Sequence, residues 1–387
     1  MRRQARFLPV LVTALLSLAC LCPLLSPSPP APVASRTIGM PASPVPPGPE
    51  PTSSPTVRTS PGEVPSVAPG QTCARGGGRP LLYTTETWKI ASICPADLAQ
   101  GQLTDTGSYV DFSWSPGGEW VAASRFDGHI ITMAFDGSGQ KQLTIVGGNS
   151  QVSWSPDAGS IAFRREAQWY SEIWVMASDG SHEKRITSEH YDTAPSWSPD
   201  GHWIVFQRGL GLMSSAEIFV IRPDGSGLTR LVADDCSGDP YWSPDGEWIS
   251  FRRGGCQLGE ASAGIFVVRP DGSQETQLTF DAWDGSLSWS PDGQRIVFTR
   301  PVPNYKGEIF VIGTDGSHET QLTFTEGLTE ACPCWSPDGE WIAYLCDRSE
   351  EEPHMRNLDS EIFVIRPDGS ERTQLTFNTD DEGCPRW

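Results

Sequence analysis

One eight-residue stretch, WSPDGEWI, occurs twice in the chain, at 242–249 and at 335–342. Related stretches begin at four further tryptophans, so that successive copies start 40, 43, 45, 47 and 46 residues apart. Within each copy an alternating apolar stretch, an EIFV-like stretch and a short QLT-like stretch follow in the same order. A unit of this length cannot bury both of its faces alone, so the copies must stack on one another.

Two kinds of turn divide each copy into four short expected strands. Ser-Pro-Asp-Gly joins the first strand to the second, because Pro presets φ, Asp bonds its own backbone and Gly accepts a positive φ. Asp-Gly-Ser joins the third strand to the fourth, at 179–181, 224–226, 271–273, 315–317 and 368–370. Radial stacking of such units gives a β-propeller, which leaves only short sheet edges.

The two ends of the repeat region look incomplete. Residues 81–104 hold three expected strands without a first one, and 382–387 holds a first strand that ends at its tryptophan. We therefore predict an all-β, seven-bladed propeller of four-stranded antiparallel blades, in which the C-terminal strand joins the N-terminal blade and closes the ring.

The repeated tryptophan is expected to pack between neighbouring blades, since it supplies a large buried aromatic area once per unit. A platform on which a ligand stacks is the alternative role. The tryptophans concerned are Trp114, Trp154, Trp197, Trp242, Trp289, Trp335 and Trp387.

The N-terminal region predicts export. Residues 1–25 combine a basic start with an apolar run, as in a signal peptide. Ser17-Leu18-Ala19-Cys20 resembles a lipoprotein box, which makes Cys20 a candidate for lipidation; an ordinary cleaved signal and an uncleaved anchor are the alternatives. Residues 26–72 are rich in Pro, Ser and Thr and are expected to form a disordered tether. The propeller, residues 73–387, is then extracytoplasmic, either membrane-anchored or secreted.

Eight cysteines remain in the propeller region, an even number that favours disulfides in an exported domain. The meander places Cys73 near Cys94, and Cys236 near Cys256. The remaining four are expected to form two bridges, one from Cys384 to Cys332 or Cys334 and the other from the cysteine left over to Cys346. A zinc site is the competing interpretation.

The sequence shows no pattern of known catalytic chemistry. A G-x-S-x-G elbow is absent, and the six histidines have no metal-ligand spacing. We therefore expect no catalytic residue, metal or cofactor. A polysaccharide-active enzyme that uses carboxylates at the mouth of the central channel is the alternative.

Candidate binding residues gather on one face. In each blade the connection from the second to the third strand, and the connection to the next blade, lie on the same face, here called the loop face. The other face, formed by the two tight turns, is called the turn face. Five arginines follow the repeat tryptophan by eleven residues, and they either form structural ion pairs or bind a ligand: Arg125, Arg165, Arg208, Arg253 and Arg300. The same loops carry aromatic residues expected to be exposed: Trp169, Tyr170, Tyr191, Trp283 and Tyr305.

The charge of the chain limits its partners. Asp and Glu number 48 against 28 Lys and Arg, a formal net charge of −20. Nucleic acid and anionic lipid are therefore excluded as partners. We expect a monomer that binds an envelope or surface protein, or a peptide or glycan, and that touches a membrane only through its N-terminus.

The unit P-x-W-S-P-D-G-x-W-I-x-F followed by E-I-F-V-I-x-P-D-G-S-x-x-T-Q-L-T resembles the repeat of TolB-family propellers over residues 80–387. The resemblance implies an extracytoplasmic β-propeller that acts by protein contact. The chain differs from TolB in lacking the α/β domain that precedes the TolB propeller.

Overall fold

The computed structural model describes residues 79–209, 216–233, 236–254, 263–281, 283–302, 306–325, 327–347, 360–377 and 382–387. The expected signal region, the tether and Cys20 lie outside these residues. All described residues belong to one compact unit, Pro61–Trp387. None of them forms a helix long and apolar enough to span a bilayer.

The described part is built from short strands joined by turns and loops. In chain order the strands are β1 (Leu81–Thr84), β2 (Ile90–Ile93), β3 (Gln100–Gln102), β4 (Tyr109–Trp114), β5 (Trp120–Arg125), β6 (Ile130–Ala134), β7 (Lys141–Gln142), β8 (Asn149–Trp154), β9 (Ser160–Glu166), β10 (Ser171–Ala177), β11 (Lys184–Arg185), β12 (Tyr191–Trp197), β13 (Ile204–Gly209), β14 (Ala216–Ile221), β15 (Thr229–Val232), β16 (Ser237–Trp242), β17 (Ile249–Arg253), β18 (Gly264–Val268), β19 (Thr276–Gln277), β20 (Gly285–Trp289), β21 (Arg295–Val302), β22 (Lys306–Gly313), β23 (Thr320–Gln321), β24 (Thr329–Trp335), β25 (Ile342–Asp347), β26 (Ser360–Ile365) and β27 (Thr373–Gln374).

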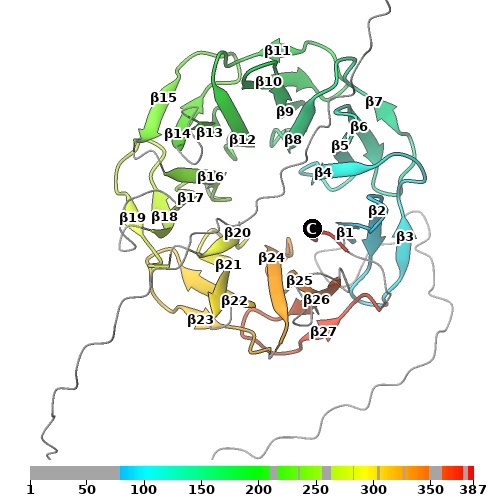
Figure 1. Ribbon diagram of the computed structural model, residues 1–387, viewed down its shortest axis with the longest axis vertical. Coiled ribbons are helices and arrows are strands. Elements are labelled where there is room, and N and C mark those ends of the chain that lie inside the picture. Colours follow the sequence, from blue (N-terminus) through cyan, green and yellow to red (C-terminus); the bar gives the residue numbers. More distant parts are fainter. Residues whose placement is uncertain are drawn as a thin grey trace, which may run out of the picture. The chain divides into compact units, whose positions relative to one another are not determined.

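The sheets follow one another around a common centre, as in a propeller (Figure 1). The prediction of seven separate four-stranded blades is wrong. The described strands form six sheets, and five of these have at least four strands: β4–β7, β16–β19, β20–β23 and β24–β27 have four each, and β8–β15 has eight. The large sheet arises because Ser171 of β10 and Tyr191 of β12 form a parallel bridge between two meanders, which spacing along the chain does not reveal.

The remaining sheet, β1–β3, has three strands. The C-terminal segment, residues 382–387, was expected to be its fourth strand, but it forms only an isolated bridge between Arg386 and Leu82. The two backbones exchange hydrogen bonds of 2.9 and 2.8 Å there, and Gly383 N–H donates to Thr84 O at 2.7 Å. The C-terminus therefore lies on the inner side of the ring beside β1 (Figure 1).

The Ser-Pro-Asp-Gly turn has the local chemistry expected of it. In the copy between β12 and β13, Ser198 Oγ donates to the Asp200 carboxylate at 2.5 Å and accepts from Trp203 N–H at 2.9 Å. Gly201 has a φ of +71°, which favours glycine. The turn therefore forms from its own residues, and it sets the register in which β12 pairs with β13.

Each repeat tryptophan lies between its own meander and the preceding one. Trp154 packs in one core cluster with Ala122 and Ile130, and its indole N–H donates to Ser113 O at 3.2 Å. Equivalent clusters hold the other repeat tryptophans, of which all but the half-buried Trp387 are buried: Trp114, Trp197, Trp242, Trp289, Trp335 and Trp387. Their faces are covered by core side chains, so this geometry supports packing rather than ligand stacking.

Candidate functional site

The arginines that follow the repeat tryptophans bind side chains of their own meander. Arg208 makes a bidentate ion pair with Asp192, with nitrogen–oxygen distances of 2.7 and 2.8 Å. Its guanidinium carbon lies 4.7 Å from the centre of the Phe219 ring. Both charged groups are buried, and Arg208 has no free edge for a ligand.

The other members of this set are used in similar ways. Arg300 binds Asp284 and Glu319, Arg165 binds Asn149 and Glu183, Arg253 binds Glu275, and Arg125 binds Asp127. Only the Arg125–Asp127 pair has both side chains at least a third exposed. The geometry therefore favours the structural interpretation over ligand recognition for these arginines.

In one sheet the buried carboxylate is paired with a different arginine, which the sequence pattern did not reveal. In β24–β27 the position eleven residues after the tryptophan is Cys346. Arg372, which lies just before β27, takes the arginine's place: its guanidinium lies 3.2 Å from Glu330 and 4.3 Å from the centre of the Phe363 ring. Its Nε also donates to Tyr344 Oη at 2.6 Å. Arg372 lies beside β27 and not at the end of the second strand of its sheet. The fixed spacing of eleven residues from the repeat tryptophan therefore does not identify it.

The loop face exposes large apolar side chains. Trp169 and Trp283 are exposed as predicted for the loops, Tyr191 is half exposed, and Tyr170 is less so. Tyr305 lies outside the described residues.

Further exposed apolar residues were missed, among them Phe280, Phe324 and Phe377, each directly after a QLT stretch. That shared position was a usable signal. Together the exposed apolar residues in the connections on this face form a set here called the hydrophobic rim: Trp88, Phe126, Ile145, Val146, Trp169, Tyr191, Phe280, Trp283, Phe324 and Phe377.

A cavity of about 530 Å³ is lined by residues of four inner strands and of the C-terminal segment. The strands are β12, β16, β20 and β24. Five of the residues that line the cavity stand directly before a repeat tryptophan. Two of these are serines, Ser196 and Ser288, and the other three are Tyr241, Cys334 and Arg386.

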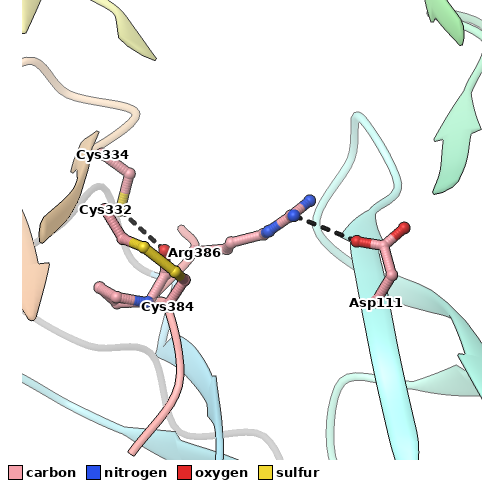
Figure 2. The surroundings of a disulfide bond; sticks show 6 residues. Asp111, Cys332, Cys334, Cys384 and Arg386 are labelled. Carbon is pink, nitrogen blue, oxygen red and sulfur yellow. Dashed lines mark hydrogen bonds and ion pairs between the residues drawn. A yellow bond between two sulfur atoms is a disulfide. The ribbon is translucent and has the colours of Figure 1, made fainter. Parts of the chain in front are cut away.

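Each of the two arginines that line the cavity, Arg252 and Arg386, is paired with a carboxylate. Arg386 Nη2 lies 3.1 Å from Asp111 Oδ1 (Figure 2), and Arg252 Nη1 lies 3.3 Å from Asp239 Oδ2. Burial raises the pKa of Asp111, and the Arg386 charge opposes that change. The pKa of Tyr241 is also raised, because the protein around its hydroxyl group removes water that would stabilise the phenolate. The residue as a whole is 45% exposed. The cavity is thus charge-balanced and lacks a free pair of carboxylates among its described lining residues.

A disulfide between Cys332 and Cys384 ties the C-terminal segment to β24 (Figure 2). This is one of the two pairings expected for Cys384. Cys94 and Cys236 are also disulfide-bonded, and their expected partners, Cys73 and Cys256, lie outside the described residues.

The expected second bridge in the last cluster is wrong, because neither Cys334 nor Cys346 forms a disulfide. Cys334 pairs across the sheet with Ala343, three residues before Cys346. At roughly 3.3 Å per residue, the two cysteines are about 10 Å apart along the strand, which is too far for a disulfide. Cys334 Sγ instead donates to Pro385 O at 3.2 Å, and burial raises the pKa of its thiol to about 12.

Within the described residues no cluster of three or more His, Cys, Asp or Glu side chains is arranged to hold a metal ion.

Comparison with solved structures shows the same fold in proteins of differing activity. The propeller of the Trilobed protease from Pyrococcus furiosus is 14% identical, with 69% of this chain and 82% of that chain covered and a TM-score of 0.51. Oligogalacturonate lyase from Vibrio parahaemolyticus is 14% identical, with 76% and 84% covered and a TM-score of 0.57. Likeness at this level of identity establishes the fold alone.

TolB from Acinetobacter baumannii is 20% identical, with 72% of this chain covered and a TM-score of 0.48, and this chain spans 65% of that protein's length. A search of curated proteins found no significant match. The model of the TolB beta propeller domain matches residues 104–301, more than half of the chain, which confirms the resemblance seen in the repeats. The chain therefore belongs to the TolB beta propeller domain family.

Proposed function

We propose that this chain is a non-enzymatic, extracytoplasmic propeller that binds a partner protein of the cell envelope through its loop face. The observation that carries the proposal is the hydrophobic rim, of which nine residues lie in connections on that one face and the tenth, Tyr191, begins β12 at the end of such a connection. Large apolar side chains grouped in this way are typical of protein interaction surfaces, and aromatic residues contribute much of the binding energy at such surfaces.

The charge of the chain points to the chemistry of the partner. With a formal net charge of −20, the chain repels acidic surfaces. A partner that combines exposed apolar side chains with Lys and Arg around them fits both the rim and this charge.

The cavity supports binding rather than catalysis. An enzyme that cleaves glycosidic bonds needs two carboxylates free to act as acid and as base or nucleophile. Among the described residues that line the cavity, Asp239 is the one carboxylate, and it is paired with Arg252, so these residues do not offer two such groups. The extracytoplasmic location is supported by the family, by the disulfides and by the signal-like N-terminal sequence.

The test is capture of envelope proteins by the purified full-length chain and by two variants. Phe280→Ser together with Phe324→Ser removes two rim side chains, and we expect recovery of the main captured protein to fall at least about tenfold, since two aromatic anchors are lost. Leu228→Ser is the matched control, because Leu228 is also exposed but follows β14 in a connection on the turn face. Equal recovery by the rim variant and the control would refute the proposal.

A further inference from the structure

Two buried glutamates meet between neighbouring sheets. Glu308 of β22 is 3% exposed and Glu330 of β24 is 1% exposed. Thr325 lies between them: its hydroxyl oxygen is 3.4 Å from Glu308 Oε1 and 3.3 Å from Glu330 Oε1. A hydroxyl has a single hydrogen, so it can donate to only one of the two carboxylates at a time. We call Glu308 and Glu330 the acid pair.

Both glutamates also have a carboxylate oxygen that is buried and unsatisfied. Among the described residues, Glu308 Oε2 and Glu330 Oε2 have no hydrogen-bond partner. Buried polar atoms are nearly always hydrogen-bonded, and an ionised oxygen without a partner is costly. A proton on one member of the acid pair would supply the missing donor.

Equivalent glutamates in another sheet bind an arginine that Glu308 lacks. Glu172 of β10 and Glu217 of β14 occupy the equivalent position, and each binds an arginine thirteen residues later: Arg185 at 3.1 Å and Arg230 at 2.9 Å. The residue thirteen positions after Glu308 is Gln321, whose amide donates to Thr323 O at 2.7 Å. Glu308 therefore lacks the cation that its counterparts have.

Among the described residues, Arg372 is the cation that contacts the acid pair. Arg300 lies opposite Glu308 on β21, but its guanidinium is bound to Asp284 and Glu319. Arg372 Nη2 lies 3.2 Å from Glu330 Oε1, and the same guanidinium also contacts Tyr344 Oη and, at 3.8 Å, Cys346 Sγ. Tyr344 is neutral, because burial raises its pKa further above the ordinary value. The titratable and charged groups described around Glu330 are thus Glu308, Arg372, Tyr344 and Cys346.

The balance of these groups favours a protonated carboxyl. The pKa of Glu330 is raised to about 7, chiefly by burial and further by the Glu308 charge, while the Thr323 and Thr325 hydroxyls and Arg372 act in the opposite direction. Two adjacent buried carboxylates resemble other like-charge pairs, in which the pKa of one group is strongly raised.

We propose that the acid pair holds one shared proton and that release of this proton moves Thr325 and, with it, the neighbouring rim residue Phe324. The backbone N–H of Thr325 donates to Glu308 Oε1 at 2.9 Å, so the connection after β23 is anchored directly to the pair. When the proton leaves to solvent, the two carboxylates repel each other and this anchor shifts. Phe324, which is 77% exposed, moves with the anchor. The regulatory meaning of the shift rests on the proposed function of the rim, but the shift itself does not.

The experiment places 4-fluorophenylalanine at position 324 of the full-length protein and follows its ¹⁹F resonance from pH 5 to pH 9. We expect one titration step with a midpoint within about one unit of pH 7, loss of that step in Glu330→Gln, and a lower midpoint in Glu308→Gln. A reporter at Phe280 is the matched control, because Phe280 also follows QLT but the residue equivalent to Glu308 in its sheet is Gly264. It is expected to show no step near neutral pH.

A flat response at position 324, or a step that persists in Glu330→Gln, would overturn the inference. If Glu330→Gln does not fold, ¹³C NMR of glutamate carboxyl groups in the unsubstituted protein decides the question: the inference requires one carboxyl that titrates near pH 7. Neither readout involves a partner. Equal capture by the rim variant and its control would therefore refute the proposed function without affecting the acid pair. A flat response at position 324 would refute the acid pair without affecting the proposed function.

Discussion

The strands β12–β15 and the junction between β20–β23 and β24–β27 are built from the same repeat but neutralise buried acids differently. In β12–β15, Asp192 is bound by Arg208 and Glu217 is bound by Arg230, which gives one cation for each anion. At the junction, Arg372 is bound to Glu330, and no arginine is bound to Glu308 among the described residues. The comparison shows that a repeat can preserve backbone geometry and core packing while the charge balance of its buried positions changes. Where the cation is missing, a proton is the remaining way to lower the cost of burial.

The largest expected effect comes from breaking the fully compensated pair. Arg208→Ala leaves the Asp192 carboxylate, whose side chain is fully buried, without its counter-ion. Removing one partner of a buried ion pair typically costs about 3–5 kcal/mol, and we expect a loss of that size in the free energy of unfolding measured with urea.

The matched control is Arg125→Ala, at the equivalent position of β5, where both members of the Arg125–Asp127 pair are at least a third exposed. Exposed pairs contribute about 0–1 kcal/mol, so this variant should remain close to the unsubstituted protein. Equal losses in the two variants would show that burial does not determine the importance of these arginines.

The arginine set also shows how far sequence reasoning extends. Arg208 and Asp192 sit at fixed distances from Trp197, so the repeat alone places them together. Arg372 could not be found in this way, because it reaches the same kind of site from another strand once Cys346 has taken the usual position. Local turns such as Ser198–Gly201 were predictable because they depend on adjacent residues.

Features that depend on contacts between sheets were not predictable. The bridge from Ser171 to Tyr191 merges two meanders into one sheet, and the C-terminal segment pairs with β1 over too short a length to count as a strand. The expected disulfide between Cys334 and Cys346 failed because the position of each cysteine along its strand, and not only the sheet it belongs to, decides the distance. The rim residues Phe280, Phe324 and Phe377 share a position directly after QLT, which marks them as a set in the sequence, and the structure adds that each is exposed.

The second-largest expected effect is a pH dependence of the free energy of unfolding, which arises at this junction. The pKa of Glu330 in the folded chain, about 7, lies above the ordinary value of 4.5 that an unfolded chain would have. Between these values the folded chain binds more protons, so stability from this group is fully present below about pH 4.5 and is lost as the pH rises through 7. A change of this size corresponds to about 3 kcal/mol.

Chemical denaturation at pH 5 and at pH 8 measures this change. The unsubstituted protein should be less stable at pH 8, and the difference should be much smaller in Glu330→Gln, since the amide does not titrate. Other groups whose pKa is raised, such as Asp111 and Asp284, remain in both proteins and cancel from the comparison. The same pH dependence in both proteins would exclude Glu330 as its source.

The smallest effect comes from making the junction resemble the compensated sheets. Gln321→Arg places a guanidinium thirteen residues after Glu308, as Arg185 stands to Glu172. Because that arginine is half exposed in its own sheet, we expect a gain of only about 1 kcal/mol at pH 8, and less at pH 5, where the proton already neutralises the acid pair.

The matched control for this change is Gln277→Arg in β19, whose sheet has Gly264 where β22 has Glu308. The same new charge has no buried acid to bind there, so unfolding measured with urea at pH 8 should show no gain. A second expectation separates charge compensation from a general effect of arginine on the surface: in Gln321→Arg the titration midpoint sensed at Phe324 should move to lower pH, because a cation beside Glu308 stabilises the ionised pair. If stability rises but the midpoint stays in place, the gain does not come from the acid pair, and the missing arginine is not what distinguishes the junction from β12–β15.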